Sequence, residues 1–255
     1  MFEMSDFFKA SPIKRIAAYL IDLILLLAIT AGIAVGIGSA MDYSGQMDAL
    51  TAHYDRYEQK YGIELDGITQ EEYQALSQKE KDNYEKAYAE MDADDEARYT
   101  LNMIVFIRLV ALGVGALVGY LILEVMLPLI FKNGQSLGKK ALGLCVMHKD
   151  HVRVGVMQVI LRAIVGKYFV GTLIPLALLM LPNFSIWIIS GSTIVAIIAM
   201  TQAFIALMSQ ANCGIHDKLF HTVVADFNQQ YIFDSIEERR AYDRELKERE
   251  AAYGA

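Results

Sequence analysis

The sequence predicts an all-α polytopic integral membrane protein with about four transmembrane helices, a helical extracytoplasmic insertion and a small cytoplasmic β element. The 255 residues are 55% apolar, and the charged residues gather in blocks between long apolar stretches. A helix needs about 20 predominantly apolar residues to cross a bilayer. Four stretches reach or approach this length: residues 14–38, 101–131, 163–181 and 184–207.

The first apolar stretch is expected to stay in the membrane as an anchor. Glu3 and Asp6 interrupt the basic segment that opens a cleaved signal peptide, and the apolar run is longer than such a peptide carries. Residues 1–38 therefore form an N-terminal lead and transmembrane helix 1.

Paired glycines suggest how the first two spans pack. The first span contains Gly32 and Gly36, and the second span, 101–131, contains Gly115 and Gly119. Small residues four apart let helices approach closely in lipid. We expect spans 1 and 2 to pack closely, within one chain or between two.

The charge distribution predicts the topology. Residues 39–100 carry 16 acidic and 6 basic side chains, whereas residues 132–167 carry 7 basic side chains and one acid, Asp150. Basic segments next to spans stay in the cytoplasm. Four spans then place the N and C termini of this multi-pass cell-membrane protein in the cytoplasm and residues 39–100 outside.

The insertion at 39–100 is predicted to be an acidic helical hairpin. Leu50, Tyr54, Tyr57 and Tyr61 recur at helical spacing. The sequence from Thr69 to Glu72 is a capping box, so a second helix should start near Gln70, and it could continue into span 2. A solvated pair that caps the spans and a surface that gathers cations or binds a partner both remain open.

The basic connector, residues 132–162, precedes span 3 at 163–181. It reads as a turn and short interfacial helix at 133–143, two short strands within 144–154, and an amphipathic helix from Val156 to Val165 that carries Arg162.

The tail, residues 208–255, should add one strand at 222–227 that joins the strands of the connector. A charged helix at 235–252 follows, opened by a capping box from Ser235 to Glu238. A solvated tail and a partner-docking helix are both compatible with this pattern.

Asp22 is the most informative ionisable residue, because a carboxylate inside a span is costly and is a functional-site hypothesis by default. Arg15 lies on nearly the same helix face, but about 10.5 Å away along the axis. That is too far for a simple ion pair, so we expect the partner of Asp22 on another helix. Span 2 carries Arg108 near its outer end, where a partner from the insertion is expected, and Glu124 near its inner end.

These motifs together resemble the RDD family of bacterial membrane proteins. The likeness rests on Arg15 with Asp22, on the segment from Asn133 to Leu144, on Arg162, and on His216-Asp217 followed by Thr222-Val-Val. The resemblance covers the region of about 12–227, without the insertion. It implies that Arg15, Asp22 and Asp217 are the name-giving residues, and that the protein is linked to transport of protons or ions.

Two interpretations of these charges stay open. A carboxylate balanced between burial and a neighbouring cation can exchange protons, as acids do in transporters. Alternatively, Asp22 belongs to a buried ion pair that fixes helix register, with Arg162 as a candidate partner. Asp217 is expected at the inner interface as a helix cap or as the partner of Arg162.

Other functional classes have little support in the sequence. Cys213, His216 and His221 are weak metal candidates by spacing alone, and Cys145 and Cys213 on the cytoplasmic side argue against a structural disulfide. No catalytic set of residues lies on one predicted face, so neither an enzyme nor a cofactor is expected. The basic connector lies against anionic lipid, which argues against nucleic acid as its partner.

The sequence therefore predicts a membrane protein that moves protons or small cations, or assists their movement, through a site around Asp22. The alternative is a scaffold that presents the acidic insertion and the charged tail to partners. The lipid bilayer is the expected environment, and a second copy or other membrane proteins are the expected protein partners.

Overall fold

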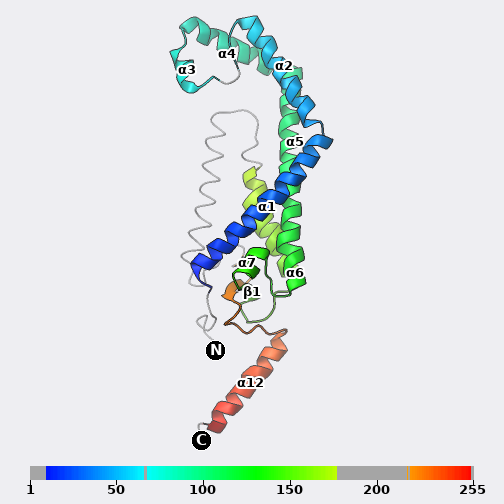
Figure 1. Cartoon of the computed structure of the whole chain (residues 1–255), viewed down its shortest axis with the longest axis vertical. Helices are drawn as coiled ribbons and strands as arrows, with labels where there is room; N and C mark the ends of the chain where they lie inside the picture. Colours follow the sequence, from blue (N-terminus) through cyan, green and yellow to red (C-terminus); the bar gives the residue numbers. More distant parts are fainter. Residues whose placement is uncertain (1–9, 66–67, 177–216, 218, 254–255) are drawn as a thin grey trace. The chain divides into compact units, whose positions relative to one another are not determined.

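The computed structural model describes residues 10–65, 68–176, 217 and 219–253. Helices dominate, and one two-stranded sheet accompanies them (Figure 1). The chain divides into two compact units. The first unit holds the chain up to Gly32, the segment from Gly113 onward and the C-terminal part, and the second holds the segment from Ile33 to Leu112.

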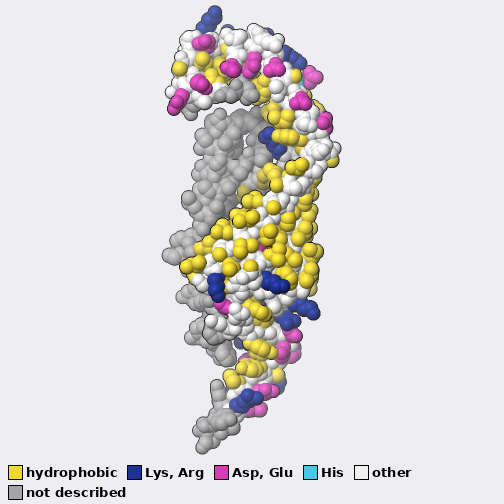
Figure 2. Space-filling model, viewed as in Figure 1, with side chains coloured by type: hydrophobic (Ala, Val, Ile, Leu, Met, Phe, Trp, Pro, Cys, Tyr) yellow, Lys and Arg dark blue, Asp and Glu magenta, His cyan; other side chains and the backbone are white. Residues whose placement is uncertain are grey.

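Helix α1, Pro12–Ala40, is the first of three helices in the described residues that are long and apolar enough to cross a membrane. Only Ala18 and Asp22 are buried on it. Apolar side chains such as Ile13 and Ile24 cover its exposed surface, as Figure 2 shows for the near face. An apolar surface left open to this extent fits a helix whose solvent is lipid.

The second candidate span, Asp95–Phe131, is continuous but not uniform. Helix α5, Asp95–Tyr120, passes into a π-helical turn, η1, Leu121–Met126, and ends in α6, Leu127–Phe131. Pro128 explains the wide turn, since it has no N–H and its ring would clash with the carbonyl four residues earlier, that of Glu124. The backbone N–H of Leu127 accordingly donates to Ile122, five residues back.

Spans 1 and 2 pack closely within one chain. A Cβ atom on Gly115 would lie 2.8 Å from the Thr30 carbonyl oxygen, and one on Gly119 would lie 2.6 Å from Leu26. The expected close packing is therefore present at the span 2 glycines. No described atom lies within 4 Å of a Cβ on Gly32 or Gly36, so the span 1 glycines do not contribute to it.

The third candidate span is Val156–Leu176. It combines α8, Val156–Leu161, with a long π-helical segment, η2, Arg162–Leu173. The predicted amphipathic helix from Val156 to Val165 and the described part of the predicted span at 163–181 form one helix, which runs unbroken through Arg162. The predicted span 184–207 and the end of the predicted span 3 lie outside the described residues.

A two-stranded antiparallel sheet pairs β1, Leu144–His148, with β2, Thr222–Asp226, in the register Leu144 to Asp226 and His148 to Thr222. This pairing confirms that 222–227 joins the connector. The expected second arm of the connector forms isolated bridges only, from Val152 to Phe233 and from Arg153 to Met147.

Both faces of the sheet are covered, which explains its apolar composition. Cys145, Met147, Val223 and Ala225 form one core. The alternate residues pack on the other face against the start of the chain: Leu144, Val146 and Val224, with Ala10 and Ala18. The N-terminal end of α1 is thus anchored on the sheet. Short helix α7, Leu137–Ala141, leads into β1.

The second unit contains α2, Tyr43–Tyr61, α3, Gln70–Ala75, and α4, Gln78–Ala93, packed around a core rich in tyrosine. The expected pairing of two main helices is present in α2 and α4. The prediction that one helix could run from Gln70 into span 2 was wrong. Ser77 and Glu80 form a second capping box that starts α4, and Asp94 separates α4 from α5.

The described part of the tail ends in α12, Ile236–Tyr253. Its first turn is capped as the sequence indicates, because the Ser235 hydroxyl accepts a hydrogen bond from the Glu238 backbone N–H at 3.1 Å. In a capping box the Glu238 carboxylate would accept a hydrogen bond from the backbone N–H of Ser235. Here it accepts one from the backbone N–H of Asp234, one residue earlier. Arg239 also donates to the Asp150 carbonyl, which ties α12 to the sheet region.

Candidate functional site: a buried network of charged residues

Asp22 is buried in the first unit and is held by the connector. Its carboxylate accepts hydrogen bonds from the Ser136 hydroxyl at 2.5 Å and from the Gly138 backbone N–H at 2.7 Å. Residue 138 has to be very small here, since a Cβ on it would lie 2.2 Å from the Ala18 carbonyl oxygen. The partner of Asp22 therefore lies outside its own helix, as expected, but it consists of a hydroxyl and an amide.

Glu124 lies in the π-helical turn of span 2, where it meets two lysines. The Lys167 ammonium from η2 lies 2.5 Å from its carboxylate, and the Lys139 ammonium from α7 lies 3.6 Å away. Lys139 also donates to the Ser136 hydroxyl at 3.0 Å. Ser136 thus joins two carboxylates, because it donates to Asp22 and accepts from the lysine that neutralises Glu124.

Arg162, in η2, pairs with Asp217 at 2.6 Å. Thr222, at the start of β2, donates to the same carboxylate at 3.2 Å. Arg162 and Asp217 are both buried. Asp217 is therefore the partner of Arg162, one of the two roles considered for it, and the suggested pairing of Arg162 with Asp22 was wrong.

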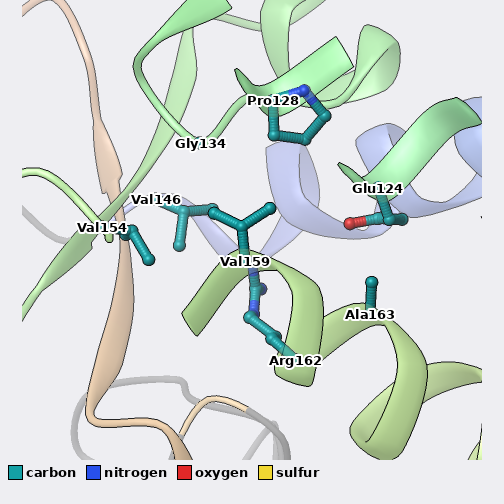
Figure 3. A pocket seen from close by; sticks show the side chains of 8 residues that line it. All are labelled: Glu124, Pro128, Gly134, Val146, Val154, Val159, Arg162 and Ala163. Atoms are coloured by element: carbon teal, nitrogen blue, oxygen red, sulfur yellow. The ribbon is translucent and has the colours of Figure 1, made fainter. Parts of the chain in front are cut away.

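A cavity of about 10 Å³ lies between Glu124 and Arg162, whose side chains enter it from two different helices (Figure 3). This volume suits about one water molecule. The Nε atom of Arg162 is buried and, within the part of the chain that the structure describes, has no hydrogen-bond partner. A buried donor without a partner is costly. A water in this cavity could bridge the guanidinium and the carboxylate.

The network is balanced in charge. Three carboxylates, those of Asp22, Glu124 and Asp217, accompany three basic groups, those of Lys139, Arg162 and Lys167. All except Lys167 are buried, and its side chain is 18% exposed. Charges removed from water must be paired and hydrogen-bonded. The arrangement can therefore hold ionised groups in a region that water hardly reaches.

Two predicted charges lie elsewhere. Arg15 is half-buried on α1 and is not among the donors to the Asp22 carboxylate. Arg108 belongs to the second unit, where it donates to the Tyr43 hydroxyl at 2.8 Å and lies 5.4 Å from the centre of that ring. The insertion supplies this partner, as expected, since Tyr43 is the first residue of α2.

The weak metal candidates do not form a site in the described residues. Cys213 and His216 lie outside them, and His221 stacks on His148 at 6.4 Å. Among the described residues no group of three histidine, cysteine or acidic side chains could hold a metal ion. Burial raises the pKa of the Cys145 thiol to about 12, so this cysteine is a core residue and no nucleophile.

Sequence reasoning missed Ser136, Gly138, Lys139 and Lys167 as members of the network. Lys167 had an available signal, because an ionisable residue inside an apolar span is a functional-site candidate by default. Ser136 and Gly138 had none of their own. Their roles arise only when the connector folds back onto α1.

The fold and this site define a class: a helical membrane protein whose connector closes a buried charge network between spans. The family comparison is more specific, since residues 9–221 match the RDD family. The chain belongs to the RDD family, whose members are membrane proteins. Comparison with curated proteins gave no match, and neither did comparison with solved structures.

Proposed function

We propose that this protein moves protons, or small cations in exchange for protons, and that the Asp22 network is its proton-handling site. One observation carries the proposal: a continuous chain of hydrogen bonds and ion pairs joins a carboxylate in span 1 to a carboxylate in span 2 through Ser136 and Lys139. Ionisable residues held inside membrane segments are typical of proton relays.

The Ser136 hydroxyl gives this chain a direction. It accepts a hydrogen bond from the Lys139 ammonium and donates one to Asp22. A proton that passes from Lys139 to the hydroxyl oxygen releases the hydroxyl proton to the Asp22 carboxylate. The step leaves a neutral amine and a neutral carboxyl group, so the net charge of the network does not change. A hydronium ion that reaches the cavity beside Glu124 can then supply the proton that Lys139 lost, by way of the Glu124 carboxylate that pairs with Lys139, and it leaves as water.

We infer that this site lies on the cytoplasmic side of the cell membrane, with both termini inside. The connector that closes the site is basic, and basic segments next to membrane spans stay in the cytoplasm. The protein would act without enzymatic chemistry, and its partners would be the lipid bilayer and the transported ion, with a second copy or another membrane protein as a further partner.

The test is flux in proteoliposomes under an imposed pH gradient. Asp22→Asn keeps the volume of the side chain and an acceptor for the Gly138 amide, but it cannot ionise. We expect wild type to move protons or a coupled cation and Asp22→Asn to fold without doing so. Asp226→Asn is the matched control, since Asp226 belongs to the same unit but pairs with Lys14, at 2.9 Å, outside the network.

Two results would contradict the proposal. The first is a well-folded wild type that produces no flux with any of several cations. The second is a folded Asp22→Asn variant with the same flux as wild type. Loss of the folded protein only in Asp22→Asn would show that Asp22 has a structural role.

The alternative function is a scaffold, and one feature of the second unit favours it. The insertion has its own core, formed by Tyr57, Leu65, Tyr84 and Ala87, and no residue of the charged network belongs to that core. Such a unit could present its acidic surface to a partner. This function would be favoured if folded wild type produced no flux and if a partner protein bound to residues 39–100.

A further inference from the structure

Helix η2, Arg162–Leu173, is a π-helix of 12 residues. π-Helices occur mostly as single turns inside α-helices, and they are frequent at functional sites. At the end of the segment the backbone N–H of Ile174 still donates to the carbonyl of Phe169, five residues earlier. An α-helix would use the carbonyl four residues earlier. Contacts of the side chains must therefore help to hold this unusual form.

The polar side chains of η2 follow a period of five residues. Arg162, Lys167 and Thr172 are separated by four mainly apolar residues each. In a π-helix, residues five apart are joined by a backbone hydrogen bond and lie nearly above one another. In an α-helix, five steps of about 100° would place them about 140° apart around the axis. The π form is therefore the one that brings these three side chains to one side.

All three side chains meet span 2 in this form. Arg162 enters the same cavity as Glu124 (Figure 3). Lys167 pairs with the Glu124 carboxylate at 2.5 Å. Thr172 is hydrogen-bonded to the Tyr120 hydroxyl at 3.0 Å. These contacts offset the ordinary preference of the backbone for the α-helix.

The α form of this segment would keep its backbone hydrogen bonds, because an α-helix satisfies its backbone groups within the span. Asp217 holds Arg162 at 2.6 Å, so the start of η2 is fixed. Conversion of the segment would then turn Lys167 about 140° away from its present direction relative to Arg162. Lys167 would leave Glu124, and Thr172 would turn away from span 2 as well.

We propose that η2 is a two-state element, with a π form in which Lys167 and Thr172 contact span 2 and an α form in which they do not. The ion pair between Lys167 and Glu124 holds the π form. A proton on Glu124 removes the charge that binds Lys167, so it favours the α form. This trigger rests on the proposed function, in which Glu124 receives a proton, whereas the two forms do not depend on it.

Distances between spin labels test the two forms in the purified full-length protein. The labels are attached at Val114→Cys and Phe169→Cys, exposed positions on α5 and η2, after replacement of Cys145 and Cys213 by alanine. A turn of more than about 100° on a helix about 10–12 Å across moves a label by about 5 Å or more. The α form should therefore give a second, separate label distance.

We expect this second distance in Lys167→Met and in Thr172→Val. Lys167→Met removes the ammonium group but keeps a long side chain, and Glu124 retains Lys139 as a partner. Thr172→Val removes only the hydroxyl, at nearly constant size, and decides the question if Lys167→Met does not fold. Glu124→Gln, which mimics the protonated carboxyl group, should give the same second distance.

Lys14→Met is the matched control, since Lys14 pairs with Asp226 at 2.9 Å outside the network. It should keep the wild-type distance. Deletion of Gly166 is a further test, because it shortens the spacing from Arg162 to Lys167 to four residues. Four α-helical steps of about 100° bring the two side chains within about 40° of each other. An α-helix can then hold both, and Lys167→Met should no longer change the label distance.

Wild-type distances in folded Lys167→Met and Thr172→Val proteins would overturn the proposal. A distance that still responds to Lys167→Met after deletion of Gly166 would also overturn it. A distance that responds as expected in a protein without any flux would support the two forms and contradict only the proposed function.

Discussion

Residue 138 must be glycine for the connector to close on α1. A Cβ there would lie 2.2 Å from the Ala18 carbonyl oxygen and 3.0 Å from the Asp22 carboxyl carbon, and the backbone cannot yield cheaply. We predict that Gly138→Ala destabilises the protein by about 1–3 kcal/mol or more, measured as a lower melting temperature in detergent. Gly32→Ala is the control, since no described atom lies within 4 Å of its added Cβ. An unchanged melting temperature for Gly138→Ala would disprove the close contact.

Asp226 is predicted to make the stability of the first unit fall at low pH. The Lys14 ammonium, hydrogen-bonded to the Asp226 carboxylate, holds the pKa of that carboxyl below its usual value. A depressed folded-state pKa stabilises the protein above the unfolded-state pKa of about 3.9, and this contribution is lost as pH falls through the folded-state value. We predict that thermal stability falls over this acid range in wild type and falls less in Asp226→Asn. Parallel pH profiles for the two proteins would contradict this.

Single residues show what sequence reasoning could and could not reach. Asp22 and Arg162 were identifiable because ionisable residues are rare in apolar helices. The partners of Asp22 were not, since a hydroxyl and a backbone amide of the connector leave no periodic pattern. Asp217 was expected as a helix cap or as the partner of Arg162, and the choice between the two roles depends on the tertiary fold, which brings Asp217 to Arg162.

Among the elements, long apolar helices and capped starts were predictable, and internal breaks were not. The capping box at Thr69 correctly marked the start of α3, but an equally good box at Ser77 ends that helix after six residues. The π-helical turns at Glu124 and Arg162 were also missed. Such turns often occur at functional sites, and here both carry charged members of the network.

Ser77 is therefore predicted to control the start of α4. Its hydroxyl accepts a hydrogen bond from the Glu80 backbone N–H. The Glu80 carboxylate in turn accepts one from the Ser77 backbone N–H at 2.8 Å. Ser77→Ala should destabilise the helix start by about 1 kcal/mol, and Ser77→Asp should retain most of the cap. Amide hydrogen exchange in the first turn of α4 measures the effect. Equal exchange in Ser77→Ala and wild type would show that the cap contributes nothing.

At the scale of the whole molecule, the charge blocks predict a topology that labelling can test. Glu80, Lys140 and Glu245 are exposed, so a single cysteine at each position can react with a reagent that does not cross the membrane. We predict that Glu80→Cys reacts in intact cells, and that Lys140→Cys and Glu245→Cys react only after the membrane is opened. Labelling of Glu80→Cys and Lys140→Cys from the same side would refute the topology.

The central claim, that the Asp22 network handles protons, is tested most directly by the pH-gradient-driven flux of Ser136→Ala in proteoliposomes. Among the residues that the structure describes, Ser136 Oγ alone joins Lys139 to Asp22, at 3.0 and 2.5 Å. Its loss should cost about 1–3 kcal/mol of stability, which leaves the protein folded, but should lower flux by about tenfold or more, because the proton loses its carrier. Wild-type flux from a folded Ser136→Ala protein would contradict the claim.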